Sequence, residues 1–187
     1  MTRLTRRIGT LVAAITLTGA ALLATTGAAA VAHPTTDFDL NGTYADAGNN
    51  LATIRNTGTV VIVDLAAPGR PDGHGVVVDH ATIFVDFPDD RSYTGVLVAP
   101  GTIRWSNSTE WTKAKAVPDV SGLTVNGATQ ALAAAGFTPN WGGTVVNCDY
   151  APGQVADQSP RAGTLVRPGS AVRFRTATRP TPPRVCE

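Results

Sequence analysis

The stretch Thr82–Trp105, TIFVDFPDDRSYTGVLVAPGTIRW, decides the fold of the first half of the chain. It contains three short runs of apolar and β-branched residues: Thr82–Phe87, Ser92–Val98 and Thr102–Trp105. In the first run Ile83, Val85 and Phe87 fall at alternate positions, so they share one face of a strand. Turn tetrapeptides separate the runs, and the second has Pro100 and Gly101 where a type II turn favours them. The stretch therefore predicts consecutive antiparallel strands.

The same pattern extends in both directions from this stretch. Thr59–Leu65 alternates in the same way, and Glu110–Lys113 follows a further turn at 106–109. No segment before residue 120 has helical periodicity. Residues 33–112 are predicted to form an all-β domain, an antiparallel meander of six to eight strands folded as a small barrel or a sandwich.

Composition excludes several classes of protein. Charged residues make up 16% of the 187 residues, aromatic residues make up 6%, and there are 19 Gly and 13 Pro. The net charge of +1 argues against bulk electrostatic capture of nucleic acid, so no nucleic-acid partner is predicted. Two cysteines and three scattered histidines do not make a zinc site. Arg far outnumbers Lys and Ala is abundant, which is typical of high-GC bacteria such as actinobacteria.

The first 32 residues have the pattern of a secretory signal peptide. Arg3, Arg6 and Arg7 precede an uncharged run that ends in Ala30-Val31-Ala32. We place cleavage after Ala32, with cleavage after Ala30 as the alternative. The run is also long enough to be an uncleaved membrane anchor. After cleavage no membrane association is predicted, and the protein is expected to be secreted or associated with the cell wall.

The remaining chain divides into two halves of opposite charge. Residues 33–112 carry a net charge of −6, and residues 113–187 carry a net charge of +4. Residues 113–116 form the predicted hinge. They are followed by an α+β domain at 117–177 and a Pro-rich tail at 178–187.

Helical periodicity first occurs in the basic half. Leu123–Ala135 places apolar residues near one helical face, Thr124 is suited to the N-cap, and Gly136 stops the helix. Strands are predicted at Val155–Ser159 and Val172–Thr176, with Pro-Gly or Ala-Gly turns around them.

These residues resemble a single PASTA repeat at 117–177. The resemblance is carried by a series of short motifs: VPDVxGLT from Val117, AGF at 135–137, PGxV from Pro152, QSP at 158–160, AGT at 162–164 and GSxV from Gly169. It implies one helix against a three-stranded sheet, and it implies recognition of peptidoglycan fragments on the outside of the cell. Trp141-Gly142-Gly143 and Cys148 depart from the family pattern. No kinase or transpeptidase domain accompanies the repeat, so no activity is implied.

Two functions from different classes follow from these observations. In the first, the protein is an exported, non-enzymatic envelope protein whose PASTA-like module binds peptidoglycan fragments or cell wall weakly. In the alternative, it is a secreted carrier or inhibitor that acts through the β-domain, with the PASTA-like module as a spacer. No catalytic motif is present, no catalytic residue, metal or cofactor is predicted, and the oligomeric state is left open.

Candidate ligand-binding residues in the basic half are Arg161, Arg173 and Arg175. Arg173 and Arg175 share parity on a strand and should project from the face opposite Val172 and Phe174. Guanidinium groups suit the carboxylates of wall stem peptides. An ordinary solvated strand face is the competing interpretation.

Two tryptophans are the candidate ligand surface of the β-domain. Trp105 and Trp111 flank a turn on adjacent predicted strands. They are predicted as core residues or as a cap over a barrel end, and a platform for a carbohydrate or an apolar ligand is the alternative.

Cys148 and Cys186 are predicted to form a disulfide. Oxidised cysteine is the default in an exported chain, and the bond would hold an extended Pro-rich tail.

Overall fold

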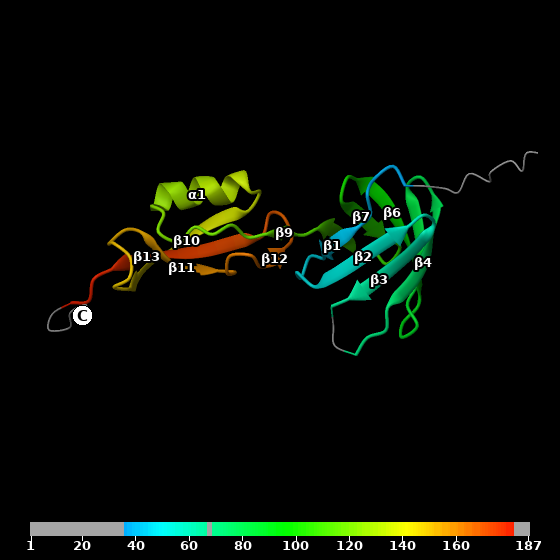
Figure 1. Ribbon diagram of the computed structural model, residues 1–187, viewed down its shortest axis with the longest axis horizontal. Helices are drawn as coiled ribbons and strands as arrows, with labels where there is room; N and C mark the ends of the chain where they lie inside the picture. Colours follow the sequence, from blue (N-terminus) through cyan, green and yellow to red (C-terminus); the bar gives the residue numbers. More distant parts are fainter. Residues whose placement is uncertain (1–35, 67–68, 182–187) are drawn as a thin grey trace, which may run out of the picture. The chain divides into compact units, whose positions relative to one another are not determined.

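The structure, a computed structural model, describes residues 36–66 and 69–181. About half of these residues lie in β-strands, and among them there is one helix. The strands form a barrel in the first half and a small helix-covered sheet in the second (Figure 1). The mainly β fold predicted from the sequence is confirmed.

The first half is a closed antiparallel barrel, which decides between the barrel and the sandwich. Its strands are β1 (Gly42–Ala45), β2 (Leu51–Thr57), β3 (Val60–Leu65), β4 (Gly73–Asp79), β5 (Thr82–Asp86), β6 (Ser92–Ala99), β7 (Thr102–Trp105) and β8 (Glu110–Lys113). Each strand pairs with the next, and β8 pairs with β1, where Tyr44 stands opposite Lys113. Closure removes the exposed strand edges that an open sheet would have.

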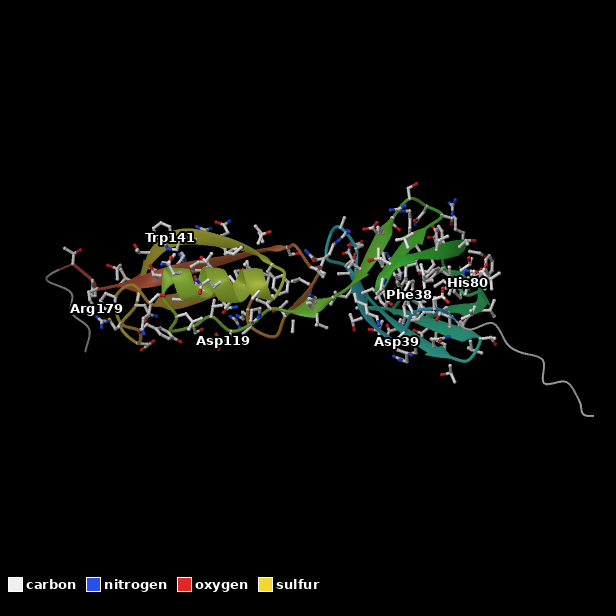
Figure 2. The ribbon with its side chains drawn as sticks, turned by 90° about the horizontal axis from the view of Figure 1, so that it is seen from above. Phe38, Asp39, His80, Asp119, Trp141 and Arg179 are labelled. Atoms are coloured by element: carbon white, nitrogen blue, oxygen red, sulfur yellow. The ribbon has the colours of Figure 1, made fainter. Side chains whose placement is uncertain are left out.

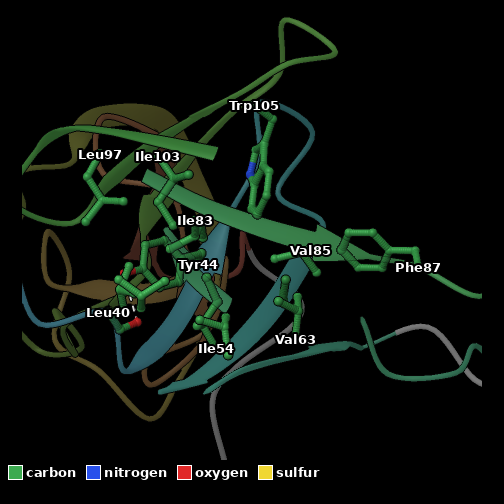
Figure 3. Packing of buried hydrophobic residues seen from close by; sticks show 13 residues of the cluster. Leu40, Tyr44, Ile54, Val63, Ile83, Val85, Phe87, Leu97, Ile103 and Trp105 are labelled. Atoms are coloured by element: carbon green, nitrogen blue, oxygen red, sulfur yellow. Dashed lines mark hydrogen bonds between the residues drawn. The ribbon is translucent and has the colours of Figure 1, made fainter. Parts of the chain in front are cut away.

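Alternate residues of each strand fill the barrel. On β3 the side chains of Val61 and Val63 are fully buried. The side chain of Val60, the first residue of the strand, is half exposed. Figure 3 shows the resulting cluster, in which Ile54, Ile83 and Ile103 meet from different strands. Burying a side chain of this kind contributes about 1.5–3 kcal/mol. The core is therefore mostly aliphatic, as the low aromatic content predicts, with Tyr44, Phe87 and Trp105 as its aromatic members.

The two ends of the barrel differ, and we call them the capped mouth and the open mouth. At the capped mouth, where β1 begins, the segment 36–41 crosses the end: Leu40 is 1% exposed, and Tyr44 Oη donates a hydrogen bond to the Leu40 carbonyl at 3.0 Å. Asp37 N donates to His80 O at 2.8 Å in the turn between β4 and β5. Phe38 packs against the core from the same segment (Figure 2). The open mouth, where β1 ends, carries the turns β1–β2, β3–β4, β5–β6 and β7–β8.

Strand β4 has glycine where its neighbours have side chains. A Cβ on Gly75 would collide with the Phe84 carbonyl oxygen, and a Cβ on Gly73 would lie 2.8 Å or less from the Phe87 ring. These glycines let β4 approach β5 closely and leave the inner face to Phe87. They also remove the apolar alternation, so the sequence indicates a strand between His74 and His80 but does not define its bounds.

The second half folds as one helix on a three-stranded sheet, as predicted. Helix α1 (Val125–Ala134) lies along the sheet formed by β10 (Thr138–Val146), β13 (Ala171–Thr178) and β11 (Val155–Ser159), in that order (Figure 1). β10 runs parallel to β13, and β11 runs antiparallel to it. A separate two-stranded ladder joins β9 (Lys115–Ala116) to β12 (Leu165–Val166). The predicted hinge at 113–116 thus contains the last residue of β8 and the whole of β9.

Helix α1 begins and ends as its sequence predicts. Thr124 is the N-cap, and its Oγ1 accepts a hydrogen bond from Gly127 N at 3.2 Å. Gly136 follows the helix at a φ of 86°, which favours glycine. Ala128 and Leu132 are completely buried against the sheet, where they join Val172 and Phe174 in a second core.

Candidate functional site

The outer face of the three-stranded sheet carries two of the predicted arginines. On the central strand β13, Val172 and Phe174 are buried beneath α1, Arg173 is exposed and Arg175 is partly exposed. This alternation is the one that the sequence predicts. The sheet therefore has one face in the core and one face available for contacts with a ligand.

Arg175 is already paired with a neighbouring carboxylate. Its Nε lies 2.9 Å from Asp157 Oδ2 on β11, and its Nη2 contacts the same oxygen. The two side chains are 39% and 43% exposed, so the ion pair contributes little to stability. It does, however, neutralise much of the charge that Arg175 would offer to an acidic ligand.

Arg173 differs from Arg175 in its surroundings. It makes no ion pair within the described part of the chain, and its guanidinium lies over Gly142 on β10. Its register partners are Asn140 on one side and Ser159 on the other, both exposed. An amide, a guanidinium and a hydroxyl thus stand side by side on the outer face.

Arg161 lies near the same end of the sheet. It is exposed, and it begins the turn after β11 in which Thr164 N donates to Arg161 O at 3.1 Å. It stands two residues beyond Ser159, the register partner of Arg173. The topology therefore brings Arg161 and Arg173 to neighbouring positions, whereas Arg175 lies farther along the strand beside Asp157.

The sequence analysis did not include Gly142 in this site. Gly142 supplies the space that the Arg173 side chain occupies. Its neighbour Trp141 is 54% exposed, an unusual environment for this residue type (Figure 2). Trp141 stands opposite the buried Phe174, so its side chain lies on the other face of the sheet from Arg173. The Trp-Gly-Gly departure from the family pattern was the signal that pointed to this part of β10.

Gln158 holds the chain that enters the second half. Its Oε1 accepts from Val120 N at 2.9 Å, and its Nε2 donates to Pro118 O at 3.1 Å. These bonds satisfy the backbone of an extended segment that belongs to no sheet. Gln158 is therefore a structural residue, not part of the exposed face.

In the barrel, Trp105 and Trp111 lie together at the open mouth. Their rings meet edge to face, with centroids 4.8 Å apart and an angle of 64° between the planes. Trp105 is 4% exposed, while Trp111 is partly buried. Both line a cavity of about 420 Å³ at this mouth.

The acidic turn between β5 and β6 does not assemble a pair of free carboxylates. Asp86 accepts a hydrogen bond from Ser92 Oγ, Asp90 accepts one from Tyr93 Oη, and Asp89 binds Arg70 through two hydrogen bonds of 2.6 and 2.9 Å. The hydrogen bond from Arg70 lowers the pKa of Asp89. Within residues 36–66 and 69–181, no group of three or more His, Cys, Asp or Glu side chains is placed to hold a metal ion.

Two predictions concern residues outside the described part of the chain. The signal peptide at 1–32 lies there, and so does Cys186, so the Cys148–Cys186 disulfide stays a prediction. Among the helices that the structure describes, none has the length and apolar character needed to cross a membrane.

Comparison with known proteins assigns a family to the second half of the chain only. Residues 115–178 match the PASTA domain family. No curated protein and no solved structure matches the chain. The match covers α1, the three-stranded sheet and the β9–β12 ladder, and it leaves the barrel without an assigned family. The chain therefore carries a single PASTA domain, at residues 115–178, after a closed eight-stranded barrel.

Proposed function

We propose that this is an exported, non-enzymatic protein of the cell envelope whose PASTA domain binds peptidoglycan fragments weakly. PASTA domains occur in cell-envelope proteins and bind peptidoglycan or related ligands. The pattern of residues 1–32 supports export. The engaged carboxylates of the acidic turn and the lack of a catalytic motif support a binding role over a catalytic one.

The observation that carries the proposal is the exposed Arg173 on the outer face of the PASTA sheet. Peptidoglycan stem peptides present carboxylates, and a guanidinium donates two parallel hydrogen bonds to a carboxylate. Asn140 and Ser159 flank Arg173 and add an amide and a hydroxyl for the peptide backbone or sugar. Arg161 adds a second cation near the same end of the sheet.

The same geometry explains why the binding should be weak. The outer face is open, and Arg173, Asn140 and Ser159 are all exposed before a ligand arrives. A shallow site buries little surface and leaves charge contacts screened by salt. Arg175 contributes less than Arg173, because a ligand must compete with Asp157 for it.

The test is retention of the purified protein on insoluble peptidoglycan at two salt concentrations. Arg173→Ala should lower the apparent affinity by about tenfold, because one charge-assisted contact is lost. Arg175→Ala should have a smaller effect, and the Arg161→Ala/Arg173→Ala double variant the largest. The decrease in binding on adding salt should be smaller for the double variant.

A matched control removes the same charge from the barrel. Arg55 forms an exposed ion pair with Asp64, and Arg104 forms one with Glu110. The Arg55→Ala/Arg104→Ala variant has the same net charge as Arg161→Ala/Arg173→Ala and should bind the wall like the parent. Equal loss in both double variants would show nonspecific charge attraction. No retention of the parent protein would refute the proposal.

A further inference from the structure

The open mouth of the barrel has features that the proposed function does not use. Strands β1, β3, β5 and β7 end there, and β2, β4, β6 and β8 begin there. The opposite mouth is filled by segment 36–41 with the buried Leu40, whereas the open mouth contains the cavity of about 420 Å³. This volume lies in the range that small-molecule sites occupy.

One buried hydrogen-bond donor in the wall of this cavity lacks an acceptor among the described residues. Trp105 is 4% exposed, and its indole Nε1 has no hydrogen-bond partner among the described residues. Buried donors are nearly always paired, so an unpaired one calls for an acceptor from outside the protein. Trp105 also lines the cavity, so a ligand held there lies against the same side chain.

The rest of the wall combines aromatic rings with oxygen acceptors. Phe87 and Tyr93 meet edge to face at 6.0 Å, as Trp105 and Trp111 do at 4.8 Å. Asp46 and Asp90 supply carboxylate oxygens from two different turns of the open mouth. Asn107 lies in a third turn, but its Oδ1 already accepts hydrogen bonds from Thr109 N and Thr109 Oγ1. Arg70, the one cation among the described residues of the wall, already binds Asp89.

This composition excludes two kinds of ligand. An anion, such as a fatty acid, would bring its charge beside Asp46 and Asp90 with Arg70 already neutralised. Hydrogen bonds from Asn50 and Gly48 outweigh the effect of burial and lower the pKa of Asp46, which is therefore ionised at neutral pH. A simple ammonium ion would suit the carboxylates and rings, but it has no acceptor to offer Trp105 Nε1.

We propose that the open mouth binds a neutral sugar, with an oxygen of the sugar accepting from Trp105 Nε1. The C–H face of a pyranose ring is apolar and packs on an aromatic ring, while its hydroxyls donate to carboxylate oxygens. A sugar thus uses the rings, the acceptors and the unpaired indole together. This site does not depend on wall binding by the PASTA domain, and it gives the carrier alternative a defined ligand class.

The test follows the indole N–H signals of the three tryptophans by NMR in the purified protein. The probes are glucose, galactose, mannose, N-acetylglucosamine and the β-1,4-linked disaccharides of glucose and N-acetylglucosamine. At least one should shift the Trp105 signal saturably, with a Kd of about 1 mM or lower. Trp141, exposed in the PASTA domain, reports any binding to that domain separately.

Trp105→Phe is the decisive variant, because it keeps an aromatic ring and removes the N–H together with the five-membered ring that carries it. It should weaken sugar binding by at least about tenfold. The lost buried volume should lower its unfolding midpoint, so binding is measured well below that midpoint, where the barrel is folded. Binding is then followed through the Trp111 signal. In the matched control Trp141→Phe, the sugar-induced shift of the Trp105 signal should be the same as in the parent.

Three outcomes would overturn the proposal. No sugar shifts the Trp105 signal, which would mean that water alone fills the mouth. Trp105→Phe binds sugar as tightly as the parent, which would mean that Nε1 is not a ligand contact. Acetate or tetramethylammonium shifts the signal and the sugars do not, which would mean that the ligand class is wrong. Loss of wall retention in Arg173→Ala with sugar binding intact would separate this site from the PASTA site.

Discussion

The barrel and the PASTA domain place a β-sheet between core and solvent in different ways. The barrel closes its sheet on itself, so the inner face becomes both the core and the cavity at the open mouth. The PASTA domain covers one face of an open sheet with a single helix and leaves the other face in solvent. A closed sheet can therefore enclose a small ligand, whereas the open sheet can only offer side chains such as Arg173 on a surface.

The two parts also differ in the size of the hydrophobic core that stabilises them. Inside the barrel Val61, Val63 and Ile83 are supported by strands on every side. In the PASTA domain Phe174 and Leu132 form the centre of a smaller core between two layers. A domain with fewer buried groups depends more on each of them.

Phe174→Ala should have the largest effect. The Phe174 side chain is 1% exposed, and its loss should cost about 3–5 kcal/mol, a large part of the stability of a domain of this size. The PASTA domain should unfold early while the barrel persists. The Trp141 indole signal reports the former, and the Trp105 and Trp111 signals report the latter. Ile83→Ala, in the barrel core, should have the converse effect, and simultaneous loss of all three signals in either variant would show that the two parts unfold as one.

The predicted disulfide is the next largest contribution. If Cys148 and Cys186 are linked, Cys148→Ser should lower the stability of the PASTA domain by about 2–4 kcal/mol and leave the barrel unchanged. The mass of the exported protein after alkylation, with and without reduction, measures the bond directly. Two alkylated cysteines without reduction would contradict the link.

Gly95→Ala tests how tightly the closed sheet is packed. The added Cβ would lie 2.9 Å from Ile103 Cγ2, 3.0 Å from Ile83 Cγ1 and 3.0 Å from Trp105 Cζ3. All three neighbours belong to the barrel core, so the substitution should cost about 1–3 kcal/mol and shift the Trp105 signal. Val96→Ala, on the outer face of the same strand, is the control and should cost less than about 1 kcal/mol. An unchanged barrel midpoint in Gly95→Ala would refute the close packing.

Low pH should destabilise the barrel more than it destabilises the PASTA domain. Hydrogen bonds lower the pKa of Asp39, Asp79 and Asp89 in the barrel, through the backbone N–H of Asn41, the backbone N–H of Ala81 and the Arg70 side chain respectively. Only Asp119 has such a resolved shift in the described part of the PASTA domain, caused by the Ser121 backbone N–H.

A lowered pKa in the folded state stabilises the fold above the unfolded value of 3.8, and this contribution is lost as the pH falls through the folded value. Thermal unfolding above and below pH 3.8 should therefore show a larger decrease in midpoint for the barrel signals than for the Trp141 signal. Equal decreases would mean that these turn carboxylates do not determine the acid sensitivity.

The parts that the sequence predicted best are those in which local pattern and turn chemistry agree. The bounds of β7 and β11 match the predicted strands at Thr102–Trp105 and Val155–Ser159, and Thr124 caps α1. Strand β10 was not predicted, because Pro139 and Gly142-Gly143 interrupt its pattern and its partner β13 lies far away in the sequence.

The candidate sites depend on pairings that periodicity does not reveal. Parity placed Arg173 and Arg175 on one face, but only the register of β11 with β13 shows that Asp157 stands beside Arg175. Trp105 and Trp111 were expected at adjacent positions, whereas the cavity between them and the turns results from barrel closure. Long-range register is a property of the folded sheet and has no local sequence signal.

Gly127→Ala should have the smallest effect on stability, and it should stabilise the PASTA domain instead of destabilising it. Gly127 lies inside α1, where alanine is favoured over glycine by up to about 1 kcal/mol. The added Cβ would lie 3.4 Å from Thr124 Oγ1 and 3.6 Å from Leu123 Cβ, which is ordinary contact and leaves the N-cap hydrogen bond in place. The midpoint of the PASTA domain should rise by up to about 4–8 °C while that of the barrel stays constant.

The control for this substitution is Gly136→Ala, at the end of the same helix. Its φ of 86° disfavours any residue with a Cβ, so this variant should lower the midpoint that Gly127→Ala raises. Differential scanning calorimetry measures both changes in midpoint. The loss of the Trp141 indole signal on heating identifies which transition belongs to the PASTA domain. A higher midpoint in both variants would mean that helix propensity alone governs α1, and a lower midpoint in both would mean that the approach of Gly127 to Thr124 is already too close for a methyl group.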